Sequence, residues 1–250
     1  MLLRFPDSRI RRACARAGHG LLLLAAGAAF AQSPAPAAAP APEGSDEAIV
    51  ARLTRLRDDF MQGVSASGFK PCKAPAIALG DPPSFGHYEP RRNAVLIGAW
   101  TRLSASEKEG FEEMAKRMGG DADARTLFEN GTYRWVYVHE LAHWWQSCRH
   151  KVRPGTWAEE SGASRIALAY WHVRDPHFAS GIVRGFRSLV SSTPSPVPQG
   201  QTPQQYLDAN FTKIARGEAY AWFQGQMVVE LTQAPPPTFH DALAQPLYPR

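Results

Sequence analysis

No apolar stretch in this chain of 250 residues is long enough to cross a bilayer as a helix. The longest, residues 21–30, has about half of the roughly 20 residues that a transmembrane helix needs. A basic segment precedes this stretch, and a small-x-small cleavage pattern, Ala29–Ala31, closes it. That order is typical of a secretory signal peptide. We therefore predict that residues 1–31 are removed during export through a bacterial-type inner membrane. The product would be periplasmic or secreted, with no stable membrane insertion.

Little net charge remains once the predicted signal peptide is removed. The whole chain carries a formal charge of +5, but residues 1–31 contribute five arginines and one aspartate, which leaves about +1 for the rest. The remaining residues contain no lysine and arginine cluster interleaved with aromatic residues. A basic surface for nucleic acid is therefore not expected.

Cysteine is also scarce, with three in the chain. Cys14 lies before the apolar stretch and not at its end, so it does not occupy the position of a lipid-anchored cysteine. Cys72 and Cys148 would meet an oxidising compartment after export, where an even count favours a disulfide. The alternative is a pair of buried free thiols.

Composition also divides the chain. Residues 32–45 are nearly all alanine and proline, a composition that favours an extended linker and cannot bury a core. Residues 46–250 are numerous enough for one domain with a sizeable apolar core. The last part of this domain, residues 234–250, is proline-rich and predicts an irregular tail.

Hydrophobic periodicity predicts an α+β fold that is predominantly helical. Two strand candidates, residues 76–79 and 94–97, flank a turn-rich segment and would form a small sheet. Helical spacing and capping patterns account for most of the other segments, and Asp175–Pro176 is a helix stop. The predicted helices span residues 46–62, 104–119, 121–129, 132–148, 161–174 and 203–231, and residues 191–205 form a loop.

The most informative segment is His139–His143, with the pattern His-Glu-x-x-His. Two histidines four residues apart are about one helical turn apart, so both imidazoles project from the same face and can bind one metal ion. Glu140, beside the first histidine, can activate a metal-bound water. The pattern therefore predicts a Zn²⁺ site held by His139 and His143. The alternative is that these are two core histidines with no metal.

A catalytic zinc site takes a third protein ligand and keeps its fourth position for water. The spacing of the metzincin peptidases requires Gly at position 146 and His at position 149, but the chain has Gln146 and Arg149. Glu159 and Glu160 are the remaining candidates, because they lie shortly after the predicted helix ends. A charged first helical turn would also explain both carboxylates.

The chain resembles the gluzincin zinc metallopeptidases in His139–His143 and in the segment Trp157–Ser164. The resemblance covers roughly residues 85–175 and implies a zincin-like domain in which the small sheet precedes the active-site helix. It also implies Glu160 as the third ligand rather than Glu159. Ser164 departs from the family pattern, which commonly has an aspartate there to accept the outer N–H of a ligand histidine.

A tyrosine-turn-strand segment, Tyr88–Ile97, resembles an element that precedes the active-site helix in several small gluzincins. If the resemblance holds, residues 94–97 form a strand near the cleft that can pair with an extended peptide. The alternative is an ordinary surface hairpin.

The resemblance implies metal-assisted hydrolysis of a peptide or protein substrate. Glu140 would take the proton of the zinc-bound water and later pass it to the leaving amine. A further donor would stabilise the oxyanion, and the sequence leaves four candidates open: Tyr220, Tyr206, His172 and His177. Six tryptophans near the predicted site either line an apolar substrate pocket or belong to the core: Trp135, Trp144, Trp145, Trp157, Trp171 and Trp222.

We therefore predict an exported zinc metallopeptidase. The alternative from another class is a non-catalytic zinc-binding envelope protein of the same fold. Glu140 argues for the enzyme, because a purely structural zinc site does not need a carboxylate there.

Overall fold

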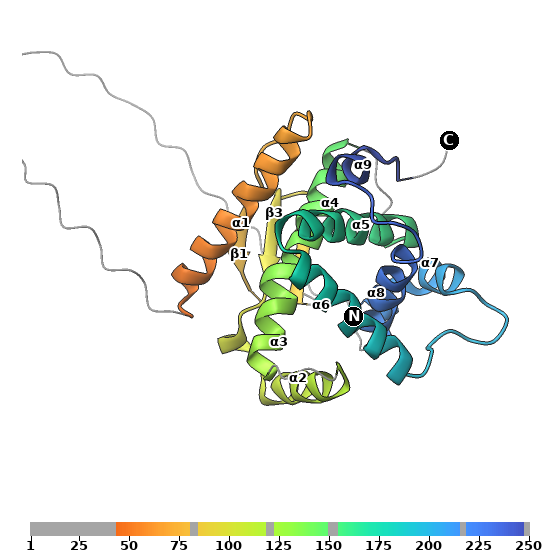
Figure 1. The fold of residues 1–250 in the computed structure, drawn as a ribbon. Helices are drawn as coiled ribbons and strands as arrows, with labels where there is room; N and C mark the ends of the chain where they lie inside the picture. Colours follow the sequence, from red (N-terminus) through yellow and green to blue (C-terminus); the bar gives the residue numbers. More distant parts are fainter. Residues whose placement is uncertain (1–43, 81–84, 119–122, 150–154, 216–218, 248–250) are drawn as a thin grey trace, which may run out of the picture. The chain divides into compact units, whose positions relative to one another are not determined.

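The computed structural model describes residues 44–80, 85–118, 123–149, 155–215 and 219–247, which belong to one unit spanning Ala41–Arg250 (Figure 1). These residues form an α+β fold that is mostly helical and contains a three-stranded sheet. The predicted signal peptide and residues 32–43 of the predicted linker lie outside the described residues. Among the helices described, none combines the length and the apolar character that membrane crossing requires.

The sheet consists of β1 (Ala76–Leu79), β2 (Gly86–Glu89) and β3 (Ala94–Ile97), in the order β1-β3-β2. Strand β3 pairs parallel with β1 and antiparallel with β2. The prediction of strands at 76–79 and 94–97 is confirmed. The expectation that residues 94–97 can pair with an extended peptide is wrong, because β3 is the central strand and both of its edges are already paired.

Strand β2 was not predicted. Its residues alternate between buried and exposed, but the buried positions are Gly86 and Tyr88. Glycine has no apolar side chain, so the alternation of apolar and polar residues that indicates a strand is absent from this segment of the sequence. Residues with positive φ lie on either side of the strand, Phe85 at 64° and Asn93 at 45°.

Helix α1 (Asp46–Ala66) contacts β1 and α4. Its N-cap is Ser45, whose hydroxyl accepts the Ala48 N–H at 3.2 Å. The helix continues past Gly63, where it was predicted to stop. A Cβ atom at Gly63 would lie 3.1 Å from the Phe239 ring, so the glycine provides room for an aromatic contact within the helix.

The segment before the two histidines contains a short 3₁₀ turn, η2 (Trp100–Arg102), and the helices α2 (Ala105–Met118) and α3 (Ala124–Asn130). A π-helical stretch, η3 (Gly131–Val136), then leads directly into α4 (Tyr137–Arg149). The helix predicted from Thr132 is therefore regular only from Tyr137. Every residue of α4 from Tyr137 to Gln146 is buried, which makes this helix the centre of the core.

The C-terminal half contains α5 (Trp157–Arg174), α6 (Pro176–Ser192), α7 (Pro203–Ile214), α8 (Ala219–Leu231) and α9 (Phe239–Ala244). Helix α6 was not predicted. Asp175–Pro176 ends α5 as expected but also starts the next helix, because the Asp175 carboxylate accepts the Phe178 N–H at 2.9 Å and proline suits the first turn.

Two further predictions about the C-terminal half are wrong. The helix predicted over residues 203–231 is two helices, α7 and α8. The tail predicted to be irregular contains α9, which docks on the core, because the Trp145 indole donates to the Leu243 carbonyl at 3.1 Å and Phe239 packs edge-on against Phe60.

The structure confirms the Cys72–Cys148 disulfide, with the two Cα atoms 6.2 Å apart. The bond joins Cys148, at the end of α4, to Cys72, in the segment before β1, and the two cysteines are 76 residues apart in the sequence.

Replacing both cysteines with serine should lower the free energy of unfolding by about 2 to 4 kcal/mol, because the unfolded chain gains entropy when this loop is opened. Urea denaturation measures the change, and reduced wild-type protein should behave like the variant. An unchanged midpoint in the variant would contradict this expectation.

Candidate metal centre

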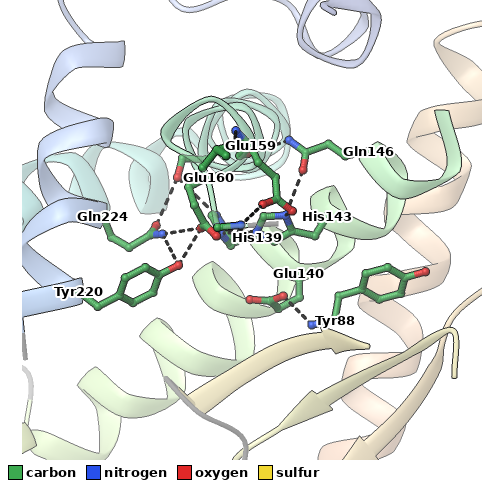
Figure 2. Close-up of polar contacts among 12 residues, drawn as sticks. Tyr88, His139, Glu140, His143, Gln146, Glu159, Glu160, Tyr220 and Gln224 are labelled. Atoms are coloured by element: carbon green, nitrogen blue, oxygen red, sulfur yellow. Dashed lines mark hydrogen bonds and ion pairs between the residues drawn. The ribbon is translucent and has the colours of Figure 1, made fainter. Parts of the chain in front are cut away.

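Helices α4 and α5 bring three side chains to one point in the core (Figure 2). His139 Nε2 lies 3.0 Å from His143 Nε2 and 3.2 Å from Glu160 Oε2, and the distance from His143 Nε2 to Glu160 Oε2 is 3.6 Å. Zinc bonds of about 2.0–2.1 Å would place tetrahedral ligand atoms about 3.3 Å apart. The three side chains therefore lie close enough to bind one metal ion.

The first turn of α5 carries both candidate glutamates. This helix begins at Trp157 rather than at Ser161 as predicted, because the Thr156 hydroxyl caps it by accepting the Glu159 N–H at 3.3 Å. Carboxylates are favourable in this position next to the positive end of the helix dipole. Glu159 and Glu160 are both buried, so the first turn is not an exposed charged surface.

Glu159 lies on the outer side of His143, away from the point where the three side chains meet. His143 Nδ1 lies 3.2 Å from Glu159 Oε1 and 3.0 Å from Gln146 Oε1. Gln146 donates its amide N–H to the Glu159 backbone carbonyl at 2.9 Å, so its oxygen is the atom directed at the histidine. Because both partners accept, they hold an imidazole hydrogen on Nδ1 and leave Nε2 as the ring atom that is directed at Glu160 and could bind a metal ion. The geometry thus favours Glu160 over Glu159 as the third ligand.

The outer side of His139 is occupied by Ser164, as the resemblance implies. Ser164 Oγ lies 3.4 Å from His139 Nδ1, and its hydroxyl donates to Gln224 Oε1 at 3.3 Å. Gln224 and Tyr220 both come from α8, the other helix that borders the site. Each donates to Glu160 Oε2, the Tyr220 hydroxyl at 2.7 Å and the Gln224 amide at 3.0 Å.

The Glu140 carboxylate is held by strand β2. Glu140 Oε2 accepts the backbone N–H of Tyr88 at 2.7 Å, and the residue is 8% exposed. The strand comes this close because Gly86 has no side chain, since a Cβ atom there would lie 2.2 Å from Val136 Cγ1 and 3.4 Å from Glu140 Cγ. In the view of Figure 2, Glu140 is drawn between Tyr220 and Tyr88, below the two histidines.

Of the four candidates for the oxyanion donor, the structure brings Tyr220 to the site. His172 is twelve residues after Glu160 in the same helix, about 18 Å along its axis, and His177 is exposed on α6. Tyr206, on α7, stacks on Phe223. Among the contacts of the described residues, none joins these three side chains to the ligand atoms. Burial and the nearby Glu160 charge raise the pKa of Tyr220 well above its ordinary value, so its hydroxyl remains a donor.

The electrostatics of the site favour positive charge. Burial alone lowers the pKa of His143, but the Glu160 charge and hydrogen bonds to Glu159 and Glu160 outweigh burial and raise it well above its ordinary value. Burial alone raises the pKa of Glu160, but the charge of His143 and the hydrogen bonds of both histidines outweigh it and lower that pKa. Both shifts show that the site stabilises a cation next to the carboxylate.

All six tryptophans near the site are buried, and most of them pack in the core. Trp145 lies between α4 and α9, and Trp171 packs on Tyr170 and Phe178. Trp144 lines a cavity of about 290 Å³ beside Tyr88 and the disulfide, and Trp145 lines a separate one of about 10 Å³ beside α9. A shared apolar pocket built from these tryptophans is therefore not observed among the described residues.

Sequence reasoning missed three groups that contact the site: the Tyr88 backbone N–H, Gln146 and Gln224. Gln146 follows His143 by three residues in α4, so a search for polar side chains one helical turn from the histidines would have found it. The Tyr88 backbone N–H carries no sequence signature, because every residue except proline has one. Gln224 follows Tyr220 by four residues in α8, one helical turn, so a search for polar partners of the tyrosine candidates would have found it.

Comparisons with known proteins add no family to these observations. No protein-family model matches the chain, no curated protein matches it, and no solved structure matches it.

Proposed function

We propose that the protein is an exported zinc metallopeptidase of the gluzincin type, with a zincin-like domain. One observation carries the proposal: His139 Nε2, His143 Nε2 and Glu160 Oε2 converge within 3.6 Å of one another, and the carboxylate of Glu140, the residue after His139, is held by the Tyr88 N–H. Three protein ligands leave the fourth position of a tetrahedral zinc ion for water, which is the arrangement of catalytic rather than structural sites.

When bound, zinc would supply the Lewis acid that activates water at neutral pH and polarises a peptide carbonyl. Glu140 would accept the proton of that water and pass it to the leaving amine. The Tyr88 N–H would hold the Glu140 carboxylate in position. Glu159 and Gln146 would keep the Nε2 lone pair of His143 directed at the metal.

Tyr220 is our proposed donor to the oxyanion. Its hydroxyl donates to Glu160 Oε2 and is therefore beside the ligand atoms, where a substrate carbonyl would become polarised. Replacing Tyr220 with phenylalanine should lower kcat by about 10²–10³-fold, the usual cost of removing one such donor, while zinc stays bound. Peptide hydrolysis and metal content measure the two effects.

Tyr206→Phe is the matched control. Tyr206 is also a tyrosine of the C-terminal helices, but it lies on α7 and stacks on Phe223. The substitution should leave kcat unchanged. Equal losses in both variants would show that the effect of Tyr220→Phe comes from packing, and would overturn the donor assignment.

The substrate in this proposal is a peptide or protein in the periplasm or outside the cell. The experiment that tests it is hydrolysis of a mixed peptide library by purified protein, with and without a zinc chelator. We expect cleavage that the chelator abolishes and that added Zn²⁺ restores. Absence of cleavage by protein that contains zinc would reject the proposal.

One observation favours a second function, that of a non-catalytic zinc-binding envelope protein. The residues His139, Glu140, His143 and Glu160 are only 4 to 9% exposed, which leaves little surface at the site for a polypeptide substrate to contact. The same library experiment separates the two functions. One zinc per chain without hydrolysis would support the binding protein, and hydrolysis would reject it. If the protein contains no metal, both functions fail and the histidines are core residues.

A further inference from the structure

Gln224 uses its side-chain amide to connect the two sides of the candidate metal centre. Its oxygen accepts the Ser164 hydroxyl at 3.3 Å, and its nitrogen donates to Glu160 Oε2 at 3.0 Å and to the Tyr220 oxygen at 2.8 Å. The residue is buried, with 8% exposed. Both amide hydrogens and the amide oxygen therefore have partners within the site.

The connection matters because the Ser164 hydroxyl could either donate a hydrogen bond to His139 or accept one from it. A hydroxyl can donate or accept, whereas a carboxylate in the same place can only accept. If Ser164 donated to His139 Nδ1, the imidazole hydrogen would move to Nε2 and face the metal position. His139 would then be unable to bind a metal ion in the observed orientation.

Gln224 removes this ambiguity. Glu160 accepts hydrogen bonds and cannot donate as a carboxylate, so it requires the Gln224 nitrogen on its side and turns the amide oxygen toward Ser164. The oxygen takes the Ser164 hydrogen, which leaves a lone pair of Ser164 for the His139 Nδ1–H. The direction of each hydrogen bond follows from the one before it, from Glu160 through Gln224 and Ser164 to His139.

The same amide also orients Tyr220. Because the second amide hydrogen occupies the phenol oxygen, the hydroxyl hydrogen of Tyr220 is directed at Glu160 Oε2. Gln224 therefore contacts one ligand directly, a second ligand through Ser164, and the proposed oxyanion donor.

We propose that Gln224 is a positioning residue, which selects the metal-binding tautomer of His139 and compensates for serine at position 164. The inference rests on the metal site of the proposed function but not on peptide hydrolysis. Gln224→Met keeps the length of the side chain and removes its hydrogen bonds. Loss of such an outer contact typically weakens metal binding by about 10–100-fold, and we expect this change in the Zn²⁺ dissociation constant.

A compensating substitution distinguishes positioning from packing. Ser164→Asp provides a partner that only accepts, so in the Gln224→Met background it should restore zinc affinity toward the wild-type value. In the wild-type background it should weaken zinc binding, because the new carboxylate would face the Gln224 oxygen. Gln226→Met is the matched control, since Gln226 lies on the same helix and donates to Glu230 away from the site. The Gln226→Met variant should bind Zn²⁺ with the same dissociation constant as the wild type.

The experiment is a Zn²⁺ titration of the full chain and its variants in competition with a chromophoric chelator. Nitrogen NMR of the histidine rings in the zinc-loaded protein provides the second readout. We expect the His139 Nδ1–H to exchange slowly with water in the wild type, where Ser164 accepts it, and faster in Gln224→Met. Ser164→Ala removes the intermediate hydroxyl alone and should produce the same faster exchange, so the test remains decisive even if Gln224→Met fails to fold.

Unchanged zinc affinity and unchanged exchange of the His139 Nδ1–H in Gln224→Met or in Ser164→Ala would overturn the proposal. Failure of Ser164→Asp to restore affinity in a folded Gln224→Met protein would also overturn it. These results are independent of activity. If the variants change zinc binding as expected but the wild-type protein cleaves no peptide, the proposed function is rejected and the role of Gln224 is supported.

Discussion

Glu140→Gln should keep its zinc and lose peptide hydrolysis. An amide cannot take a proton from water, and removal of a general base typically costs about 10²–10⁴-fold in rate. The substitution keeps the size of the side chain, and the glutamine oxygen can still accept the Tyr88 N–H that holds Glu140 now. The fold should therefore be unchanged. Steady-state kinetics and the zinc content of the same preparation measure the two parts of this prediction.

Glu89→Gln is the control for this experiment. Glu89 is the last residue of the strand that holds Glu140, but its carboxylate is half-buried and is not part of the site. It should retain both zinc and activity. If Glu140→Gln instead lost its metal and kept its activity, Glu140 would be a ligand rather than the base, and the assignment would be wrong.

Glu160→Gln and Glu159→Gln should differ strongly in zinc affinity, although the two residues are neighbours. Glu160 presents its oxygen to both Nε2 atoms, so replacing it removes the charge of a ligand atom. We expect affinity to fall by more than about 100-fold, beyond the range of outer contacts. Within the site Glu159 faces His143 Nδ1, where Gln146 remains as an acceptor, and its other oxygen accepts the Gly155 N–H at 2.6 Å. A loss of about 10-fold is expected there.

Competition titrations with a zinc chelator measure both constants. The opposite order, with the larger loss in Glu159→Gln, would identify Glu159 as the ligand and would require α5 to be rotated about its axis relative to the structure. Equal and small losses would mean that neither carboxylate binds the metal.

The parts of the site that follow from local geometry could be predicted from the sequence. The spacing of His139 and His143 determines that both rings share one face of a helix. The choice between Glu159 and Glu160 could not be derived from the residues alone, because neighbours in a helix point about 100° apart and the packing of α5 on α4 decides which one faces the histidines. The resemblance favoured Glu160, and the geometry agrees with it.

The parts that depend on distant backbone could not be predicted. Strand β2 has a glycine where a buried strand would have an apolar residue, so neither the strand nor its N–H toward Glu140 has a pattern in the sequence. Helix α6 was missed because Asp175–Pro176 is both a stop and a start signal. The break between α7 and α8 was missed because apolar residues continue at helical spacing through both helices.

X-ray absorption at the zinc edge, on protein loaded with one equivalent of Zn²⁺, tests the central claim most directly. We predict one tightly bound zinc per chain, coordinated by two imidazole nitrogens at about 2.0–2.1 Å and by carboxylate and water oxygens, with no sulfur. Glu160→Gln should reduce the occupancy of this site. A protein that binds no zinc, or a zinc ion without two imidazole ligands, would contradict the assignment of His139, His143 and Glu160 as a metal centre.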